Sequence, residues 1–471
     1  MKRVKTTIFF ILYFTATLLF AQKYNFKITK ESSYNTIIHN GKIAIKKGDY
    51  TLIPALSEKK DIKWAKNFQM VEMGGVDDFK ITKELLKKRG ILNIKYHIGY
   101  DWMPATYYYT NGENRDFVKW LYTDRFHLTL NPNGPFVHCK KNHYNWCKDY
   151  YYDYGNELLI DKRVENLMKN LKRSGFNGLF FDWASGSFIN NKNFKIMKNN
   201  FEKKHKKKNY FIQIAKFYKK LKKEKIFFVT NQAFRQEKYL LKNIIYDMTE
   251  SYITTNRTKK MDIQIVGKGW IHLVDTTDYY PIYKNSKSIK DSLHFIDILT
   301  SYKNKYKKYG FKNFIYLNYI APKYERVYST MPIYRLKKPK NAIYFGYAMA
   351  KLTNNIVYAQ ISKNKELEKD SVYFYDLGSV LGKKYIKINP YDIYIRFYTN
   401  GFVVASEAYN KNKYIKITSD FIPNNKFIYN PYDDNWIKSG KHSVTIKISY
   451  EKDTFTQKKL PTGRVFLYEK D

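Results

Sequence analysis

Several features that mark other protein classes are missing from this sequence. No short repeat runs through its 471 residues, which excludes collagen-like and coiled-coil proteins. Beyond residue 20, no apolar run is long enough to cross a membrane. The P-loop, H-E-x-x-H and G-x-S-x-G motifs do not occur, and no G-x-G-x-x-G follows a predicted strand. We therefore predict no cofactor.

Acidic residues and arginine are scarce relative to lysine. The chain has 85 Lys and Arg against 42 Asp and Glu, a formal net charge of +43, yet only 12 of the basic residues are Arg. Phosphates and base edges are recognised mainly through the arginine fork, so we predict no nucleic-acid partner. The richness in Lys, Asn, Ile and Tyr is typical of an AT-rich genome. Attraction to an acidic partner stays open as a second explanation.

The first 21 residues have the pattern of a signal peptide. Three basic residues within positions 1–5 precede an apolar run over residues 6–20, which ends at Ala21. The run is short for a helix that spans a membrane, which favours a cleaved signal peptide. However, Leu19 stands at the third position before the expected cut, where a small residue is usual, so an uncleaved anchor stays open. We predict export to the periplasm, cell surface or medium, with cleavage near Ala21. No integral membrane segment is predicted afterwards.

The two cysteines lie close together in the sequence. Cys139 and Cys147 fall in one predicted loop, and in an exported protein they can form a disulfide. With His138 and His143 they make the pattern H-C-x3-H-x3-C, whose spacing matches no standard zinc finger. We favour the disulfide, leave two free thiols open, and predict no metal site.

Between residues 66 and 364, short apolar runs alternate with amphipathic, lysine-faced stretches. This alternation predicts buried parallel strands separated by helices. The predicted strands are residues 68–75, 93–102, 127–130, 178–183, 226–232, 243–252, 313–319 and 356–360. The predicted helices are residues 78–89, 162–173, 209–223, 292–309 and 341–352, and the rest of residues 103–160 is predicted as an irregular aromatic loop. Eight such units favour an α/β fold of the (β/α)8 TIM-barrel type, with a doubly wound sheet as the alternative.

After residue 365 the pattern changes to short β-rich pieces separated by Asn, Gly, Pro and Asp turns. The predicted strands here are residues 384–388, 393–398, 402–406, 414–417, 442–450 and 464–468. They predict a small antiparallel β-sandwich. The predicted organisation is a signal peptide (1–21), a lead-in (22–65), a TIM barrel (66–364) and a β-sandwich (365–471).

Two carboxylates stand at the ends of predicted buried strands. Asp182 follows Gly-Leu-Phe-Phe, and Glu250 follows Tyr-Asp-Met-Thr. In a TIM barrel the carboxyl ends of the strands form the active site. Two carboxylates there suit glycoside cleavage, because one attacks or activates water while the other protonates the leaving oxygen. The structural alternative is helix capping or pairing with lysine, and Asp247 replaces Glu250 if the strand register is off by a few residues.

Other polar and aromatic residues fall at or beside the same strand ends. Aromatic rings there can stack on sugars and raise the pKa of a neighbouring carboxyl group by desolvation. His97 is more typical of a core histidine, and the run KKHKKK at residues 203–208 is more typical of a solvated loop. The predicted substrate-binding residues are Glu72, Asp101, Trp102, Trp183, Asn231, Tyr252 and Asn318.

Three segments resemble a group of bacterial enzymes. Residues 171–182 (LKRSGFNGLFFD) resemble the fourth strand, "GFDG-(apolar)3-D", of the hypothetical glycosyl hydrolase families with TIM barrels and of the polygalactosaminidase-like enzymes. Residues 246–251 (YDMTES) resemble the sixth-strand glutamate of that group. Residues 375–382 (YDLGSVLG) and 394–404 (YIRFYTNGFVV) are similar to its C-terminal strand block. The departures are Asn177 for the usual Asp, which affects a turn, and Ala405-Ser406 for Val-Asn.

The resemblance implies a TIM barrel followed by a β-sandwich, with Asp182 as nucleophile or base and Glu250 as acid/base. We predict an exported glycoside hydrolase that acts on a carbohydrate, with an anionic glycan favoured if the net charge has a role. Two other interpretations stay open. One is a non-catalytic carbohydrate-binding or cell-envelope protein on a degenerate barrel, and the other is a basic adhesin that binds polyanions through surface lysines.

Overall fold

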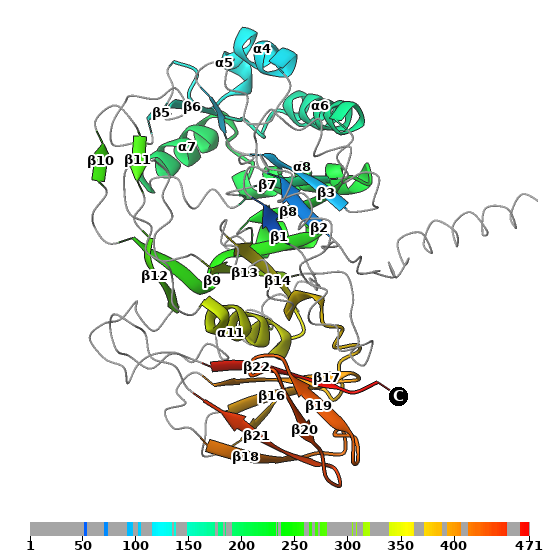
Figure 1. The fold of residues 1–471 in the computed structure, drawn as a ribbon. Coiled ribbons are helices and arrows are strands. Elements are labelled where there is room, and N and C mark those ends of the chain that lie inside the picture. Colours follow the sequence, from blue (N-terminus) through cyan, green and yellow to red (C-terminus); the bar gives the residue numbers. More distant parts are fainter. Residues whose placement is uncertain are drawn as a thin grey trace, which may run out of the picture.

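The structure is a computed structural model, and Figure 1 shows its fold. The longer stretches that it describes are residues 115–133, 148–174, 191–231, 237–258, 339–361, 372–388, 393–406, 413–449 and 462–470. The shorter ones are residues 51–53, 70–73, 92–97, 102–104, 136–137, 178–181, 263–265, 269–271, 274–279 and 314–320, with Ala184, Ala233, Asn304 and Lys308.

Parallel strands occupy the middle of the molecule. They are β1 (Thr51–Ile53), β2 (Met70–Met73), β3 (Leu92–His97), β7 (Gly178–Phe181), β8 (Phe227–Asn231), β9 (Tyr246–Thr258), β13 (Phe314–Ile320) and β14 (Ile356–Ile361). Each strand pairs in parallel with the next in this order, and β14 also pairs with β1. The pairings therefore return to the strand from which they start. The second half of β9 pairs antiparallel with β12 (Val274–Tyr279).

Helices and short strands connect these parallel strands. Between β3 and β7 lie β4 (Trp102–Pro104), α4 (Arg115–Thr123), α5 (Arg125–Leu128), β5 (Phe136–Val137), β6 (Lys148–Tyr151) and α6 (Glu157–Ser174). Farther along are α7 (Asn191–Lys204), α8 (Tyr210–Lys223), α9 (Glu237–Leu240), the 3-10 turn Leu241–Asn243, the hairpin strands β10 (Ile263–Ile265) and β11 (Gly269–Ile271), and α11 (Pro339–Leu352). Strands β4, β6 and β5 form a small antiparallel sheet of their own.

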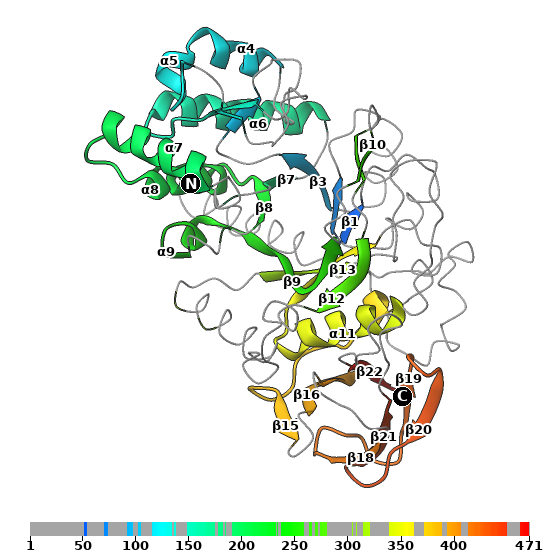
Figure 2. The ribbon, with the colours of Figure 1, turned by 90° about the vertical axis from the view of Figure 1, so that its left-hand side faces the viewer.

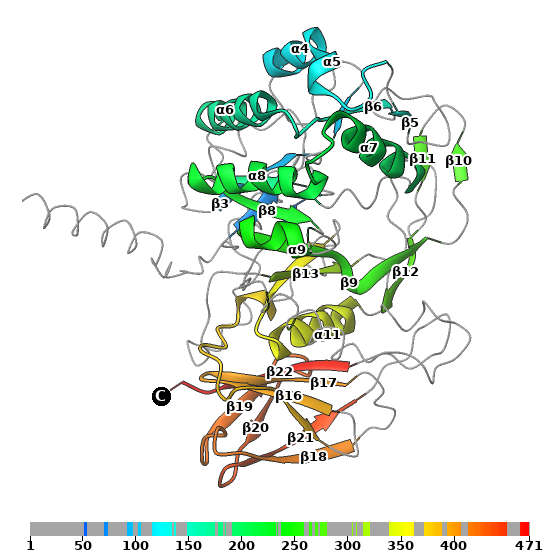
Figure 3. The same cartoon turned by 180° about the vertical axis from the view of Figure 1, so that it is seen from behind.

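Helix α8 shows how a helix covers these strands, and it lies over β8 in Figure 3. The side chain of Asn209 caps its first turn, because Oδ1 accepts from the backbone N–H groups of Phe211 (3.0 Å) and Ile212 (3.2 Å). The buried rings of Phe217 and Tyr218 then meet Phe181 of β7, with centroids 5.8 and 5.7 Å away. The predicted helix at 209–223 is confirmed, and its apolar stripe is the face that packs on the strands.

The C-terminal part consists of two antiparallel sheets that face each other. One has the strand order β15 (Ile386–Ile388), β16 (Ile393–Tyr398), β17 (Gly401–Ser406), β22 (Thr462–Tyr468), β19 (Phe427–Asn430) and β20 (Asn435–Lys438). The other pairs β18 (Lys413–Thr418) with β21 (Ser443–Ile448). Alternate residues of the larger sheet, such as Phe397 and Val404, pack with Ile415 and Ile446 of the smaller one. The antiparallel C-terminal sheet predicted from the turn-separated runs is confirmed.

Helix α11 lies between the parallel strands and the larger C-terminal sheet (Figures 1 and 2). The opposite face of that sheet, including Val403 and Val465, joins Tyr347 of α11 in one hydrophobic cluster. The contact depends on Gly463, because a Cβ at this position would lie only 2.4 Å from the Cα of Phe345. The C-terminal sheets are therefore docked through a shared core.

The D-L-G segment of the sequence resemblance forms a turn against the β16–β17 hairpin. Asp376 Oδ1 accepts from the backbone N–H of Gly378 at 3.0 Å, and Gly378 has a left-handed φ of +75°. The Asn400 side chain donates to the backbone carbonyl of Asp376 at 3.0 Å, and the Asn400 N–H donates to Leu377 O at 3.0 Å. These residues of the motif have a structural role in joining the turn to the hairpin.

Several element predictions are wrong. The first half of the predicted third strand at residues 127–130 lies in helix α5, where the N–H groups of His127 and Leu128 both donate to Asp124 O at 3.1 Å, and Thr129 after it forms only an isolated bridge with Tyr152. The predicted strand at 93–102 divides into β3 and β4, which belong to different sheets. Residues 103–160 contain α4, α5, β5 and β6 rather than an irregular loop. Strand β1 lies within the predicted lead-in, so the parallel strands begin before residue 66.

The basic run at 203–208 is not simply solvated. Its members Lys204, His205 and Lys208 hold the turn at Asp153 and Gly155, some 50 residues earlier in the sequence. Lys208 Nζ donates to Gly155 O at 2.7 Å, and Lys204 also donates to His127 O at 2.9 Å. This run therefore fastens α7 to the chain segment before α6.

Among the helices that the structure describes, none combines the length and the apolarity that a membrane crossing requires.

Candidate functional site at the strand ends

The structure describes the predicted site residues to different extents. Asp101, Asp182, Trp183, Cys139 and Cys147 lie outside the described residues. The backbone of five others is assigned: Glu72 in β2, Trp102 in β4, Glu250 and Tyr252 in β9, and Asn318 in β13. Asn231 closes β8 and is 1% exposed. Trp102 pairs with Tyr151 in the small sheet, so it does not end a strand of the parallel set as predicted.

Three neighbouring strands reach the same level where the predicted carboxylates occur. Phe181 of β7 is the register partner of Thr230 in β8, and Thr230 is the partner of Asp247 in β9. Asp182 is the next residue after Phe181 in the sequence, and Glu250 comes three residues after Asp247. Both predicted catalytic positions thus follow one row of paired residues.

The two faces of these strands can be told apart from their aromatic contacts. Phe181 and Phe228 both meet Tyr218 of α8, with ring centroids 5.7 and 5.4 Å away. Side chains alternate along a strand, so Phe180 and Asn231 belong to the face turned away from α8. Both are buried, at 3% and 1% exposure. Asn231 therefore lies at a buried strand end, and its role in substrate binding stays a prediction.

Asp247 has a structural position on the helix-facing side. Its side chain is fully buried, and Oδ1 accepts from the Thr230 hydroxyl at 2.7 Å and from the Ala233 N–H at 3.0 Å. In the same region the Ala184 N–H donates to the Asn231 carbonyl at 3.0 Å. These bonds link the chain beyond β7 to the end of β8, and the chain beyond β8 to β9. The Asp247 carboxylate therefore positions the segment that follows β8.

The register between β9 and β13 breaks near Glu250. Thr249 is the partner of Tyr316, but the next pair joins Thr254 to Asn318, so residues 250–253 lie opposite the single residue 317. Irregularities of this kind bend a strand and redirect its side chains, and they are frequent beside active sites. Glu250, Tyr252 and Asn318 all fall at or next to this break. The topology therefore brings together three residues that the sequence analysis selected separately.

A buried arginine supports β7 from the helix side. The guanidinium of Arg163 in α6 lies 4.5 Å from the ring centroid of Tyr152, 4.9 Å from that of Phe217 and 5.9 Å from that of Phe181. It also donates a hydrogen bond to the Tyr154 hydroxyl. Sequence analysis missed Arg163, because nothing in the helical pattern of residues 162–173 marks one cation as buried.

A second charged cluster fixes the turn before α6. Asp153 is fully buried and accepts from His205 Nε2 at 2.8 Å, from Lys204 Nζ at 2.8 Å and from the Gly155 N–H at 3.0 Å. All three partners are donors, which is the arrangement that a buried carboxylate needs. No group of His, Cys, Asp and Glu suited to a metal ion occurs among the residues that the structure describes.

The comparisons with known proteins give different results for the sequence and for the structure. No family model and no curated protein sequence matches this chain. Solved structures do. The maltogenic α-amylase AmyB from Thermotoga neapolitana matches with a TM-score of 0.50 and 11% identity, over 89% of this chain and 98% of that chain. The glycoside hydrolase domain of PelA from Pseudomonas aeruginosa matches with a TM-score of 0.37 and 12% identity, over 66% and 94%. The α-amylase from Geobacillus thermoleovorans gives 0.42 and 11%, over 90% and 98%.

The match to AmyB shows a shared fold, since it extends over nearly the whole of both chains. The chain thus shares the fold of this α-amylase, which supports the sequence resemblance to glycoside hydrolases at the level of the fold. The polygalactosaminidase-like subgroup stays a prediction. An identity of 11% carries over neither substrate nor catalytic residues, so these are argued from the strand ends alone.

Proposed function

We propose that the protein hydrolyses glycosidic bonds with Asp182 and Glu250 at the carboxyl ends of a (β/α)8 barrel. The observation that carries this proposal is the closing order of parallel pairings, in which β7 and β9 flank β8. A doubly wound sheet would leave two unpaired edges instead. In the barrel, the ends of all eight strands converge on one mouth.

The spacing of the strands supports the carboxylate pair. Neighbouring strands are about 4.8 Å apart, so β7 and β9 are separated by about 10 Å across β8. Asp182 comes one residue and Glu250 three residues after the paired row, which adds an offset of about 7 Å along the strands. The two carboxyl groups of glycosidases lie about 5 to 10 Å apart. Side chains that reach toward each other across β8 can bring the two carboxyl groups into that interval. The carboxylates of retaining and inverting enzymes both fit, and the resemblance favours retention.

The proposed chemistry assigns one role to each carboxyl group. The protonated Glu250 donates its proton to the leaving glycosidic oxygen as the bond to the anomeric carbon breaks. The ionised Asp182 either attacks that carbon or takes the proton of the attacking water. Asp247, held by Thr230 and Ala233, sets the position of the chain that follows Asn231 at the end of β8. Glu72, Asp101, Trp102, Trp183, Tyr252 and Asn318 complete the proposed substrate-binding set.

We also propose that the protein is exported. The basic residues of positions 1–5, the apolar run over residues 6–20 and the small residue Ala21 support this proposal. Export places the enzyme where polysaccharides of the envelope or surroundings are accessible.

A polysaccharide panel tests the proposed function. The purified protein is incubated with neutral and acidic polysaccharides, and newly formed reducing ends are measured over time. We expect a linear increase on at least one substrate, with soluble products of defined length. Retention of the protein on a polysaccharide without any release of reducing ends would instead favour the non-catalytic alternative.

A further inference from the structure

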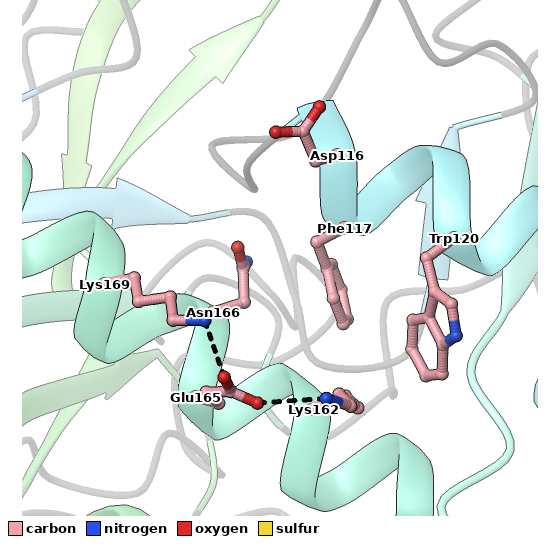
Figure 4. A pocket seen from close by; sticks show the side chains of 7 residues that line it. All are labelled: Asp116, Phe117, Trp120, Lys162, Glu165, Asn166 and Lys169. Atoms are coloured by element: carbon pink, nitrogen blue, oxygen red, sulfur yellow. Dashed lines mark hydrogen bonds and ion pairs between the residues drawn. The ribbon is translucent and has the colours of Figure 1, made fainter.

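A hollow between α4 and α6 lies apart from the strand ends (Figure 4). Its volume is about 350 Å³, which is within the range of pockets that bind small ligands. Seven residues line it: Asp116, Phe117 and Trp120 from α4, and Lys162, Glu165, Asn166 and Lys169 from α6. Figure 1 places these helices at the end of the molecule opposite the C-terminal sheets. We call this hollow the α4–α6 groove.

One wall of the groove is aromatic. Phe117 and Trp120 are three residues apart on α4 and therefore share one helix face, with ring centroids 5.5 Å apart. Phe117 is 7% exposed and belongs to the core, whereas Trp120 is only partly buried against that core. The wall thus combines a ring that is buried in the core with an indole that is only partly buried (Figure 4).

The other wall is a row of polar side chains. Residues 162, 165, 166 and 169 have the spacing of one helix face, and all four line the groove. Glu165 accepts from Lys169 at 2.6 Å and from Lys162 at 3.3 Å. Hydrogen bonds from Lys169 and then Lys162 lower the pKa of Glu165, so its carboxyl group is ionised at neutral pH. The row therefore presents ammonium donors, carboxylate acceptors and the Asn166 amide side by side.

The charge of the groove differs from that of the whole chain. The lining holds two lysines and two acidic residues, Glu165 and Asp116, so it has no formal net charge, against +43 for the chain. A polyanion gains little from a balanced surface of this kind. A neutral saccharide suits it better, because its C–H faces fit the partly exposed indole and its hydroxyl groups can both donate and accept.

We propose that the α4–α6 groove binds a unit of a neutral polysaccharide, which stacks on Trp120 and is hydrogen-bonded by Lys162, Glu165, Asn166 and Lys169. The proposal goes beyond the hydrolysis at the strand ends, since binding here uses neither Asp182 nor Glu250. Such a site would hold a polymer chain on the enzyme while other units of the polymer occupy the active site.

Affinity electrophoresis tests the groove with defined probes. Native gels contain dextran, galactomannan or arabinoxylan as neutral polymers, and polygalacturonate as an acidic one. We expect at least one neutral polymer to retard the protein, and Trp120→Ala to weaken that retardation about tenfold. Lys169→Ala, at a side chain that is 73% exposed, is expected to weaken it about threefold without affecting the fold. Far-UV circular dichroism shows whether Trp120→Ala is folded. If Trp120→Ala does not fold, the retardation of Lys169→Ala is the test of the groove.

The controls separate this site from the active site and from surface charge. Tyr414→Ala removes an aromatic side chain that is 72% exposed on β18, far from α4 in Figures 1 and 2, and is expected to leave retardation unchanged. Asp182→Asn is also expected to retain it, whether or not the protein hydrolyses glycans. The proposal is overturned if no neutral polymer retards the protein, if Trp120→Ala and Lys169→Ala behave like the wild type, or if Asp182→Asn abolishes retardation. Retardation by polygalacturonate alone overturns it as well.

Discussion

Glu250→Gln will lower the hydrolysis of an ordinary glycosidic bond by about 10²- to 10⁴-fold, the usual contribution of a general acid. Glutamine has nearly the same shape but no acidic proton that it can transfer to the leaving oxygen. An aryl glycoside with an acidic phenol needs little protonation, so its first bond cleavage will be affected much less. The measurement is kcat/KM for a sugar-linked and an activated aryl substrate with both proteins.

Asp247→Asn is the matched comparison, because Asp247 is the alternative acid on the same strand. The amide oxygen of asparagine can still accept the hydrogen bonds of the Thr230 hydroxyl and the Ala233 N–H, so we expect the chain after β8 to stay close to its place. We expect similar losses on both substrates, since a positioning defect does not depend on the leaving group. If Asp247→Asn loses much more activity on the sugar-linked substrate than on the aryl substrate, and Glu250→Gln does not, the general acid has been assigned to the wrong residue.

Asp153→Ala will destabilise the protein by about 3 kcal/mol, at the lower end of what the loss of one partner from a buried ion pair costs. The substitution removes the acceptor of His205, Lys204 and the Gly155 N–H at once. His205 is 16% exposed, so its ring stays largely buried after its partner is lost. Urea unfolding followed by circular dichroism gives the change in the free energy of unfolding.

Lys203→Ala is the control for this prediction. Lys203 is an exposed member of the same basic run, and its replacement is expected to change the stability by less than about 0.5 kcal/mol. Equal stability of the two variants would show that the Asp153 cluster contributes nothing to folding.

The sequence predicts best those elements whose pattern is local. The Gly-Leu-Phe-Phe strand, the amphipathic helix α8 and strand β16 are found where apolar periodicity and turn residues place them. Strand β1 has three residues in the structure, too short to show a period, and it was missed. Residues 127–130 were predicted as a strand, but the N–H groups of His127 and Leu128 donate to Asp124 O and close a helical turn, whereas Thr129 forms an isolated bridge with Tyr152. In that case local hydrogen bonding outweighs propensity.

The features that could not be predicted from the sequence depend mostly on contacts between residues far apart in the chain. Asp153 is joined to His205 across 52 positions, and Asp247 is joined to Thr230 across 17. Nothing in the sequence around Asp153 marks it as buried, and nothing around Asp247 marks Thr230 as its partner. The register break beside Glu250 is equally hidden, since it depends on how β13 pairs with β9.

The large positive charge is partly paired in the described helices. Lys216 and Lys220 of α8 bond to Glu157 and Asp161 of α6, in the first case at 2.7 Å. Exposed pairs of this kind add little stability. They nevertheless show that lysines on these helices lie beside acidic partners, in agreement with the neutral lining of the α4–α6 groove. The net charge alone therefore does not indicate a polyanionic ligand.

The most direct test of the proposed function compares Asp182→Asn with Asp161→Asn on a substrate that the wild-type protein cleaves. The two substitutions are chemically identical, but Asp161 has a side chain that is 57% exposed on α6. Initial rates of reducing-end release are measured for the three proteins at equal concentration. We expect Asp161→Asn to match the wild type and Asp182→Asn to lose at least about 10³-fold. Full activity of Asp182→Asn would contradict the proposal that carboxylates at these strand ends carry out the hydrolysis.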